Sequence, residues 1–146
     1  MANADGLRAA LDQLAEQRFT DGVAALVEDV REAAPRDSGV LEASIGEAGR
    51  SGGPGRFETT IVAPVEYASY QDEGTGIYGP KGVPIRPVNG RVLAWEGSAS
   101  LAGFGFPGAG RTASGMVFAA EVRGSPATRF WSDNVTSERW GEVLGG

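Results

Sequence analysis

Glycine is the residue that most restricts what this chain can fold into. It accounts for 23 of the 146 residues and is concentrated after residue 45, in runs such as 51–55 and 103–108. Glycine loses more backbone entropy on ordering than any other residue, and glycine-rich runs mark turns and loops. We therefore expect short regular elements joined by long loops after residue 45. No segment repeats at a fixed period, so a solenoid is not expected.

The first part of the chain carries the longest helical pattern. One apolar face recurs at Leu7, Leu11 and Leu14, and a second follows it, formed by Phe19, Val23, Leu26, Val27 and Val30. This spacing predicts a helix over residues 6–34. Residues 20–22 lie between the two faces and predict a kink or a break. Pro35 ends the helix because it disfavours the helical conformation in the residue before it.

The glycine-rich part predicts shorter elements. Asp37 or Ser38 is expected to cap a helical turn. Apolar alternation predicts strands, and two tyrosines lie on a predicted short helix. The predicted segments are a turn at 50–55, strands at 57–65, 91–95 and 116–122, and a short helix at 66–72. Ser125 and Pro126 have the sequence of a helix start.

These elements combine into an α+β fold within a single domain over residues 1–146. We expect a helix at 6–34, an antiparallel sheet of three to four strands with loops within 46–124, and a C-terminal helix at 126–144. Residues 77–90 and 97–114 are long for loops of a compact domain. Loops of that length are usually functional or order when they bind a partner.

Composition makes an enzyme a poor expectation. The chain has no cysteine and no histidine, which removes thiolate chemistry, the most frequent general base and the commonest zinc ligand. The net charge is −6 without a basic stripe, so the chain is not expected to grip nucleic acid. No apolar run approaches the roughly 18 residues of a membrane span. We expect no enzymatic activity, no cofactor, no metal and no membrane.

Candidate chemical motifs have simpler structural explanations. Residues 74–79 and 103–108 both match the dinucleotide pattern G-x-G-x-x-G, but neither is followed by a predicted helix that would present amides to a phosphate. Residues 74–81 lack the magnesium-binding hydroxyl of a P-loop. Glu66, Asp72 and Glu73 are more simply a solvated helix face than a carboxylate pair. The three tryptophans, Trp95, Trp131 and Trp140, are expected in the core.

Three segments together carry a resemblance to one family. Residues 34–45 match A-P-x-D-[ST]-G-x-L-x-x-S-I, residues 65–76 are similar to Y-A-x-[YF]-x-[EH]-x-G-T, and residues 125–131 are similar to an element with Pro-x-x-Phe-Leu. In this order and spacing they resemble the head–tail joining, neck and tail-completion proteins of long-tailed bacteriophages. The likeness spans nearly the whole chain. Gln71-Asp72-Glu73 and Trp131 depart from the patterns, which leaves neck protein, tail-completion protein and tail terminator ring open.

The resemblance implies a structural virion protein without catalytic activity. It implies a homo-oligomeric ring, a hexamer, which joins the head-completion or connector protein to the tail terminator or tail-tube protein. DNA would pass through an acidic lumen without specific binding. The location implied is the neck or tail of the virion, and the host cytoplasm during assembly.

The signature residues have structural roles under this reading. Pro35 and Gly39 shape the helix exit, Ser38 caps the turn, Tyr67 and Tyr70 pack that turn against the sheet, and Gly74 and Gly76 permit positive φ. The signature residues are Pro35, Asp37, Ser38, Gly39, Leu41, Tyr67, Glu73, Gly74, Thr75 and Gly76. Candidate oligomer or partner contacts are Tyr78, Lys81, Ile85, Phe104 and Phe106.

Two other functions remain open from the residues alone. The first is a small-ligand or peptide-binding module that uses residues 74–82 and the neighbouring aromatic side chains. The second is a carboxylate-based hydrolase that uses Glu66, Asp72 or Glu73, which the missing histidine and cysteine disfavour.

Overall fold

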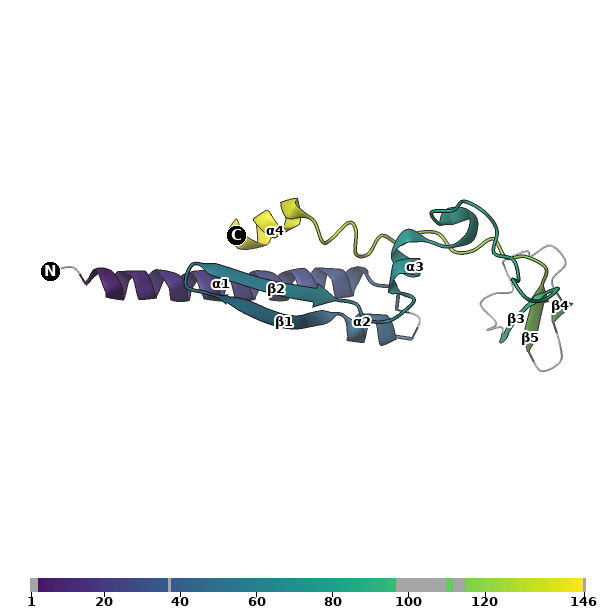
Figure 1. Ribbon diagram of the computed structural model, residues 1–146, viewed down its shortest axis with the longest axis horizontal. Coiled ribbons are helices and arrows are strands. Elements are labelled where there is room, and N and C mark those ends of the chain that lie inside the picture. Colours follow the sequence, from purple (N-terminus) through teal and green to yellow (C-terminus); the bar gives the residue numbers. More distant parts are fainter. Residues whose placement is uncertain (1–2, 37, 97–109, 112–114, 146) are drawn as a thin grey trace. The chain divides into compact units, whose positions relative to one another are not determined.

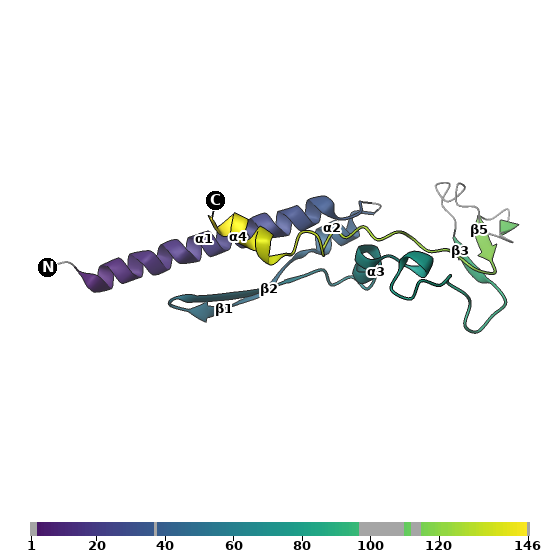
Figure 2. The same cartoon turned by 90° about the horizontal axis from the view of Figure 1, so that it is seen from above.

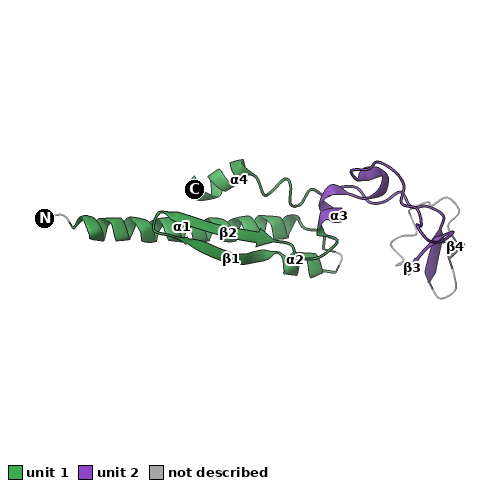
Figure 3. Cartoon of the chain, in the orientation of Figure 1, with its two compact units in different colours: residues 1–68, 129–146 green, residues 69–128 purple. Residues whose placement is uncertain are grey.

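The chain forms two compact units in a computed structural model that describes residues 3–36, 38–96, 110–111 and 115–145 (Figures 1 and 3). Unit 1 comprises residues 1–68 and 129–146, and unit 2 comprises residues 69–128. Unit 2 is thus inserted into unit 1. That the two units fold together as the single domain predicted from the chain length stays a prediction.

Unit 1 is built on one long helix, α1 (Ala4–Ala33). The side chain of Asn3 accepts a hydrogen bond from the Gly6 amide, at 3.1 Å, and caps the start. The end lies where Pro35 predicts it, since Ala34 is extended with ψ of 140°. The predicted kink or break at residues 20–22 is wrong, because α1 is continuous through Gly22.

The short helix α2 (Val40–Ser44) follows, and its start differs from the prediction. Gly39 is the N-cap in the left-handed conformation, with φ of 71°. The Ser38 hydroxyl accepts only a long 3.4 Å contact from the Val40 amide. Ser38 is therefore not the cap, and Asp37 lies outside the described residues. The conformational freedom of Gly39 redirects the chain instead.

A hairpin then runs alongside α1 in both views (Figures 1 and 2). It consists of β1 (Gly46–Gly53) and β2 (Arg56–Val62), paired antiparallel with an irregularity between Glu47 and Gly49. The predicted turn at 50–55 is wrong over its first four residues, which belong to β1. Glycine composition hid this strand, because its partner β2 and not its own side chains stabilises it.

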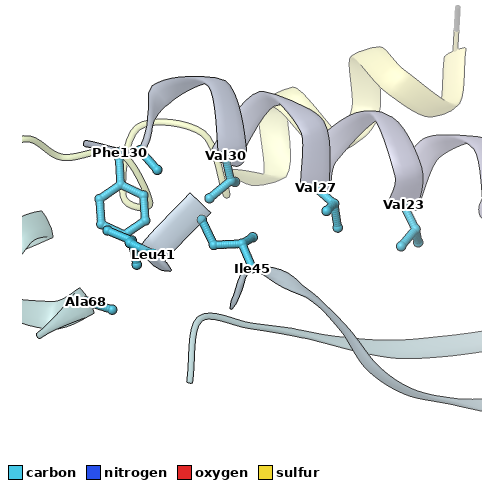
Figure 4. Packing of buried hydrophobic residues seen from close by; sticks show 8 residues of the cluster. Val23, Val27, Val30, Leu41, Ile45, Ala68 and Phe130 are labelled. Carbon is cyan, nitrogen blue, oxygen red and sulfur yellow. The ribbon is translucent and has the colours of Figure 1, made fainter. Parts of the chain in front are cut away.

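The core of unit 1 joins segments that are far apart in the sequence. It contains Val23, Val27 and Val30 of α1, together with Leu41, Ile45, Ala68 and Phe130 (Figure 4). Phe130 is only 2% exposed. The N-terminal half of α1 contributes nothing to it: Leu7 remains 64% exposed, and Leu11 and Leu14 are also exposed. Only the second of the two predicted apolar faces is buried.

The closing helix is α4 (Ser137–Gly145), much shorter than the predicted 126–144. Ser125 and Pro126 do not start it, because the backbone there is engaged by another segment and Arg129 has φ of 53°. The helix is capped by Thr136, whose hydroxyl accepts a hydrogen bond from the Arg139 amide at 3.1 Å. α4 packs on α1 at Gly22, next to Trp140 and Leu144.

The described residues of unit 2 form only short regular elements. It holds most of α3 (Ala68–Glu73), the 3₁₀ turn η1 (Gly76–Tyr78) and a small sheet. The sheet has the order β3-β5-β4, with β3 at Leu93–Glu96, β4 at Gly110–Arg111 and β5 at Met116–Ala119. The α+β class is therefore confirmed. The single sheet of three to four strands is wrong, since the described strands form two separate small sheets and β4 is only two residues long.

Candidate functional site

The second and third resemblance segments meet inside unit 2. The Thr75 amide donates to the Ser125 carbonyl at 2.9 Å, and the Ile77 amide donates to the Arg123 carbonyl at 2.8 Å. In return, the Ser125 amide donates to the Thr75 hydroxyl at 2.9 Å. This backbone crossing of residues 71–79 with residues 123–128 is the best-defined arrangement of predicted signature residues.

The crossing extends through Thr128. Its amide and its hydroxyl both donate to the Gln71 carbonyl, at 2.9 and 2.7 Å. Gln71 is the C-terminal part of α3, so these bonds satisfy a carbonyl at a helix end, where a partner within the helix is missing. Residues 125–128 are therefore not helical, because their backbone is bound to another segment, and the predicted helix does not begin there.

Glycine is required at the crossing because two backbones touch. A β carbon on Gly76 would lie 2.0 Å from the Arg123 carbonyl oxygen, and one on Gly124 would lie 2.1 Å from the Thr75 oxygen. Both residues also have positive φ, at 62° and 93°. The positive φ predicted for Gly74 and Gly76 is confirmed, while the close approach to residues 123–127 could not be read from the sequence.

The same geometry removes the dinucleotide motif at residues 74–79. Its amides already have acceptors within the chain: those of Thr75 and Ile77 bind the opposite segment, and those of Tyr78 and Gly79 bind Thr75 and Gly76. A phosphate cradle needs such amides free and aimed at the ligand. The second motif, at 103–108, lies outside the described residues.

The first resemblance segment serves the core of unit 1. Leu41 and Ile45 are buried there against Phe130, which belongs to the third segment (Figure 4). The guanidinium of Arg31 donates to the Ile45 carbonyl at 2.7 and 3.0 Å and fixes the exit of α2. Residues 34–45 thus have a packing role.

The tyrosines do not pack as predicted. Tyr67 is exposed and Tyr70 is 62% exposed, so neither holds the α2 turn against a sheet. Leu41 and Ile45 are covered by Phe130 and α1 instead. Both tyrosines flank Ala68, the small residue of this stretch that is buried in unit 1.

The candidate acidic residues Glu66, Asp72 and Glu73 differ in their surroundings. Glu66 and Glu73 are exposed, whereas Asp72 is buried and has an interaction partner. Within the part of the chain that the structure describes, no three acidic residues gather where a metal ion could bind. The tryptophans fit the core prediction in unit 1, where Trp131 and Trp140 pack against the buried cluster.

An exposed apolar surface follows the crossing. Val83, Ile85, Val88 and Val92 are all exposed, with Val88 at 93%, and Tyr78 lies just before them. Exposed apolar side chains that are grouped in one stretch of sequence are candidates for protein contacts. We call Tyr78, Val83, Ile85, Val88 and Val92 the apolar loop surface.

The apolar loop surface is held by two contacts. Ile85 and Val122 exchange both backbone hydrogen bonds, at 2.8 and 2.9 Å, and Arg86 forms an ion pair with Glu121 at 3.0 Å. The loop is therefore anchored at its centre while its valines face solvent. A sequence signal for the additional valines existed, because Val83 and Val88 lie beside Pro84 and Pro87 in the same loop as the predicted contact Ile85.

The predicted contact residues divide into two groups. Tyr78, Lys81 and Ile85 are exposed, as a contact requires. Phe104 and Phe106 lie outside the described residues. Val83, Val88 and Val92 are the additional candidates that the structure brings in.

A polar cluster on the hairpin is the other notable arrangement. Arg50 binds both carboxylate oxygens of Glu47, at 2.8 and 3.0 Å, and donates to the Thr20 hydroxyl at 2.6 Å. The Thr59 hydroxyl donates to Glu47 at 2.6 Å. The hydrogen bonds from Arg50 and Thr59 lower the pKa of Glu47 below its ordinary value. Glu47 is thus a structural acceptor and a poor general base.

Comparisons of the chain with protein-family models, curated proteins and solved structures give no match. Among the helices of the described segments, none is long and apolar enough to cross a membrane. Any assignment of function therefore has to come from the residues and their geometry.

Proposed function

We propose that the chain is a non-enzymatic ring subunit of a tailed-bacteriophage particle, at the junction between head and tail. One observation carries the proposal: the three segments that resemble the family signatures have joint structural roles. Residues 71–77 hydrogen-bond to residues 123–128, and Phe130 shares a core with Leu41. These residues take part in the core and in the backbone crossing, and such roles are those expected of a structural protein.

The surface of unit 2 supports an assembly role. The apolar loop surface exposes several valines that a monomer gains nothing by displaying. Burial against a neighbour would remove them from water and add stability that a small core lacks. Glycine-rich loops that order on contact would pay their entropy cost at that step.

The proposed partners follow from this position. The chain would form a homo-oligomeric ring of six copies between the head-completion or connector protein and the tail terminator or tail-tube protein. A net charge of −6 suits a lumen through which DNA slides without sticking. The protein would reside in the virion and, before assembly, in the host cytoplasm. A tail terminator ring is the nearest alternative position.

Electron microscopy of purified particles tests the proposal directly. The expected result is a ring of this protein at the neck. In the genome, we expect portal and capsid genes upstream and a tail-tube gene downstream. Free subunits can be monomeric before assembly, so the particle is the stronger test. A chain that is never found in purified particles overturns the proposal.

A paired variant tests the apolar loop surface. Val83→Ser with Val88→Ser should abolish incorporation into particles and leave the monomer folded, because both side chains are exposed. The matched control is Leu7→Ser with Leu11→Ser, which removes two exposed apolar side chains from α1. Normal incorporation of the valine variant would exclude this surface as the contact.

A further inference from the structure

We infer that the β1–β2 hairpin pairs edge to edge with the hairpin of a second copy of this chain, so that β2 of one copy lies against β1 of the next. The inference rests on the proposed ring and names one of its interfaces. It uses residues 46–62 of unit 1, which the apolar loop surface does not include.

The hairpin has two open edges. Its sheet contains only β1 and β2 within the described residues, so each strand has a partner on one side alone. Every residue of β1 from Glu47 to Gly53 is exposed. An isolated two-stranded sheet is marginally stable in water. Contacts with α1 through Phe57 and Arg50 support one face of the hairpin but neither edge.

The β2 edge carries few of the features that keep strands apart. Natural edge strands are usually blunted by proline, lysine, a bulge or very short length. β2 pairs regularly with β1 from Arg56 to Thr60, and the register shifts between Thr60 and Ile61 because of the irregularity in β1. The strand has no proline and no lysine, and Thr59 to Val62 are four consecutive β-branched residues. Such a strand has high propensity to accept another strand.

The two edges are complementary in charge and size. Arg56 and Glu58 of β2 project from the face opposite Phe57 and form an ion pair at 3.2 Å. On that face β1 carries Gly49, Ser51 and Gly53, the cross-strand partners of Thr60, Glu58 and Arg56. A neighbour's β2 laid beside β1 would therefore set its charges next to small neutral residues. No like charges would oppose each other across the seam.

Room for side chains exists on the hairpin. A hollow of about 390 Å³ is lined by residues 48–51 and 58–60. Charge on the other face is already neutralised, because Glu47 and Arg50 bind each other. The seam therefore requires no new buried ion and no rearrangement of the polar cluster.

A second copy fits these edges better than an unrelated strand. β1 and β2 run antiparallel, so identical hairpins placed side by side in one direction pair β2 with β1 of the next copy, again antiparallel. The contact uses two different edges and is heterologous, which closes into a ring when the rotation allows. A foreign strand would cover one edge and leave the other open.

Disulfide trapping in this cysteine-free chain tests the pairing. Ser51→Cys is made in one preparation, and Glu58→Cys and Thr60→Cys in two others. Mixing Ser51→Cys with either β2 variant excludes disulfides within one hairpin. The expected result is a mixed dimer on oxidation, while each variant alone stays uncrosslinked. Glu138→Cys on α4, mixed with Ser51→Cys, is the matched control and should remain monomeric.

Hydrogen exchange provides a measurement without substitutions. Amides of residues 46–62 in the full-length protein should be less protected in dilute solution than at the highest soluble concentration or in the assembled ring. Protection of both strands supports the seam. Crosslinks that join only β2 to β2 indicate a two-fold dimer and overturn the inference. Absence of mixed crosslinks and of protection at all concentrations also overturns it.

These outcomes are separable from the fate of the proposed function. A ring seen in particles whose hairpins neither crosslink nor gain protection retains the function and removes the seam. Mixed crosslinks in a protein that never enters particles retain the seam and remove the function.

Discussion

Each of the two units of this chain is stabilised internally by a different kind of contact. Unit 1 is a side-chain structure, in which valines of α1 pack with Leu41, Ile45 and Phe130 around one core. The described part of unit 2 buries few side chains, Ala119 and Asp72 among them, and is organised by backbone hydrogen bonds between residues 71–79 and 123–128. A packed core is destabilised when the shape of a buried side chain changes. The backbone crossing is instead sensitive to a β carbon at Gly76 or Gly124, where two backbones touch.

This contrast indicates how the units can serve an assembly. Side-chain packing gives unit 1 a stable frame that presents the hairpin. Unit 2 exposes Val83, Ile85, Val88 and Val92 on a loop anchored by two backbone hydrogen bonds. Regions with few buried apolar contacts have low local stability and are the ones that adapt on binding. The predictions below test whether the two units respond separately.

The largest expected effect comes from Phe130→Ala. Phe130 is almost fully buried in unit 1, so its removal should lower the free energy of unfolding by about 3–5 kcal/mol. Urea denaturation measures this loss. The control Tyr78→Ala, on an exposed side chain of unit 2, should change stability by less than about 0.5 kcal/mol. Equal losses in the two variants would contradict the division into a packed and an unpacked unit.

Gly76→Ala should damage unit 2 and spare unit 1. The left-handed backbone costs about 1–2 kcal/mol with any β carbon, and contact with the Arg123 carbonyl adds about 1–3 kcal/mol. Gly82→Ala is the matched control, since its φ of 63° is the same but its surroundings are open. Hydrogen exchange should accelerate at residues 71–79 and 123–128 in the first variant alone. Identical exchange rates in both variants would show that the effect of the substitution comes from the positive φ and not from the contact at the crossing.

Asp29→Asn should weaken the contact between α4 and α1 by less than either change above. The Asp29 carboxylate accepts a hydrogen bond from Arg139 at 2.7 Å, and this bond, with a second to Glu142, raises the pKa of the Arg139 guanidinium. Glu142→Gln removes the more exposed of the two partners and should have the smaller effect. Exchange of the α4 amides measures both. A larger effect from Glu142→Gln would refute the role of Asp29 as the anchor.

The smallest expected effect is a pH dependence confined to the hairpin. Glu47 has a folded-state pKa below its ordinary 4.5, because Arg50 and Thr59 donate hydrogen bonds to its charged form. Its contribution is therefore complete above pH 4.5 and is lost as pH falls through the folded-state pKa. Amide protection in residues 46–62 should decline between neutral pH and about pH 2. Glu47→Gln should flatten this dependence, and an unchanged profile would exclude Glu47 as its source.

Part of the fold could be read from local sequence. The extent of α1, its end at Pro35, the strand at β2 and the short helix α3 follow from periodicity and from proline and glycine stereochemistry, which act within a few residues. The positive φ of Gly74 and Gly76 follows from the same local rules. The absence of histidine and cysteine chemistry follows from the composition alone.

Other features could not be read locally. β1 is a strand only because β2 pairs with it, and Leu7, Leu11 and Leu14 are exposed although their spacing is as regular as that of the buried valines. Residues 125–128 have the sequence of a helix start but are not helical, since Gln71 and Thr75 form hydrogen bonds with this segment. The backbone of residues 125–128 depends on a partner far away in the chain, and β1 depends on the strand that follows it.

The sequence by itself determined the α+β class, the long first helix and the inventory of side chains that makes an enzyme a poor expectation. Only the tertiary structure decided that the three signature-like segments have joint roles, that glycines 74, 76 and 124 exist for a backbone crossing, and that valines of the 77–92 loop face solvent. The physical reason is range. Local propensity is set by neighbours in sequence, whereas burial and strand pairing are set by neighbours in space.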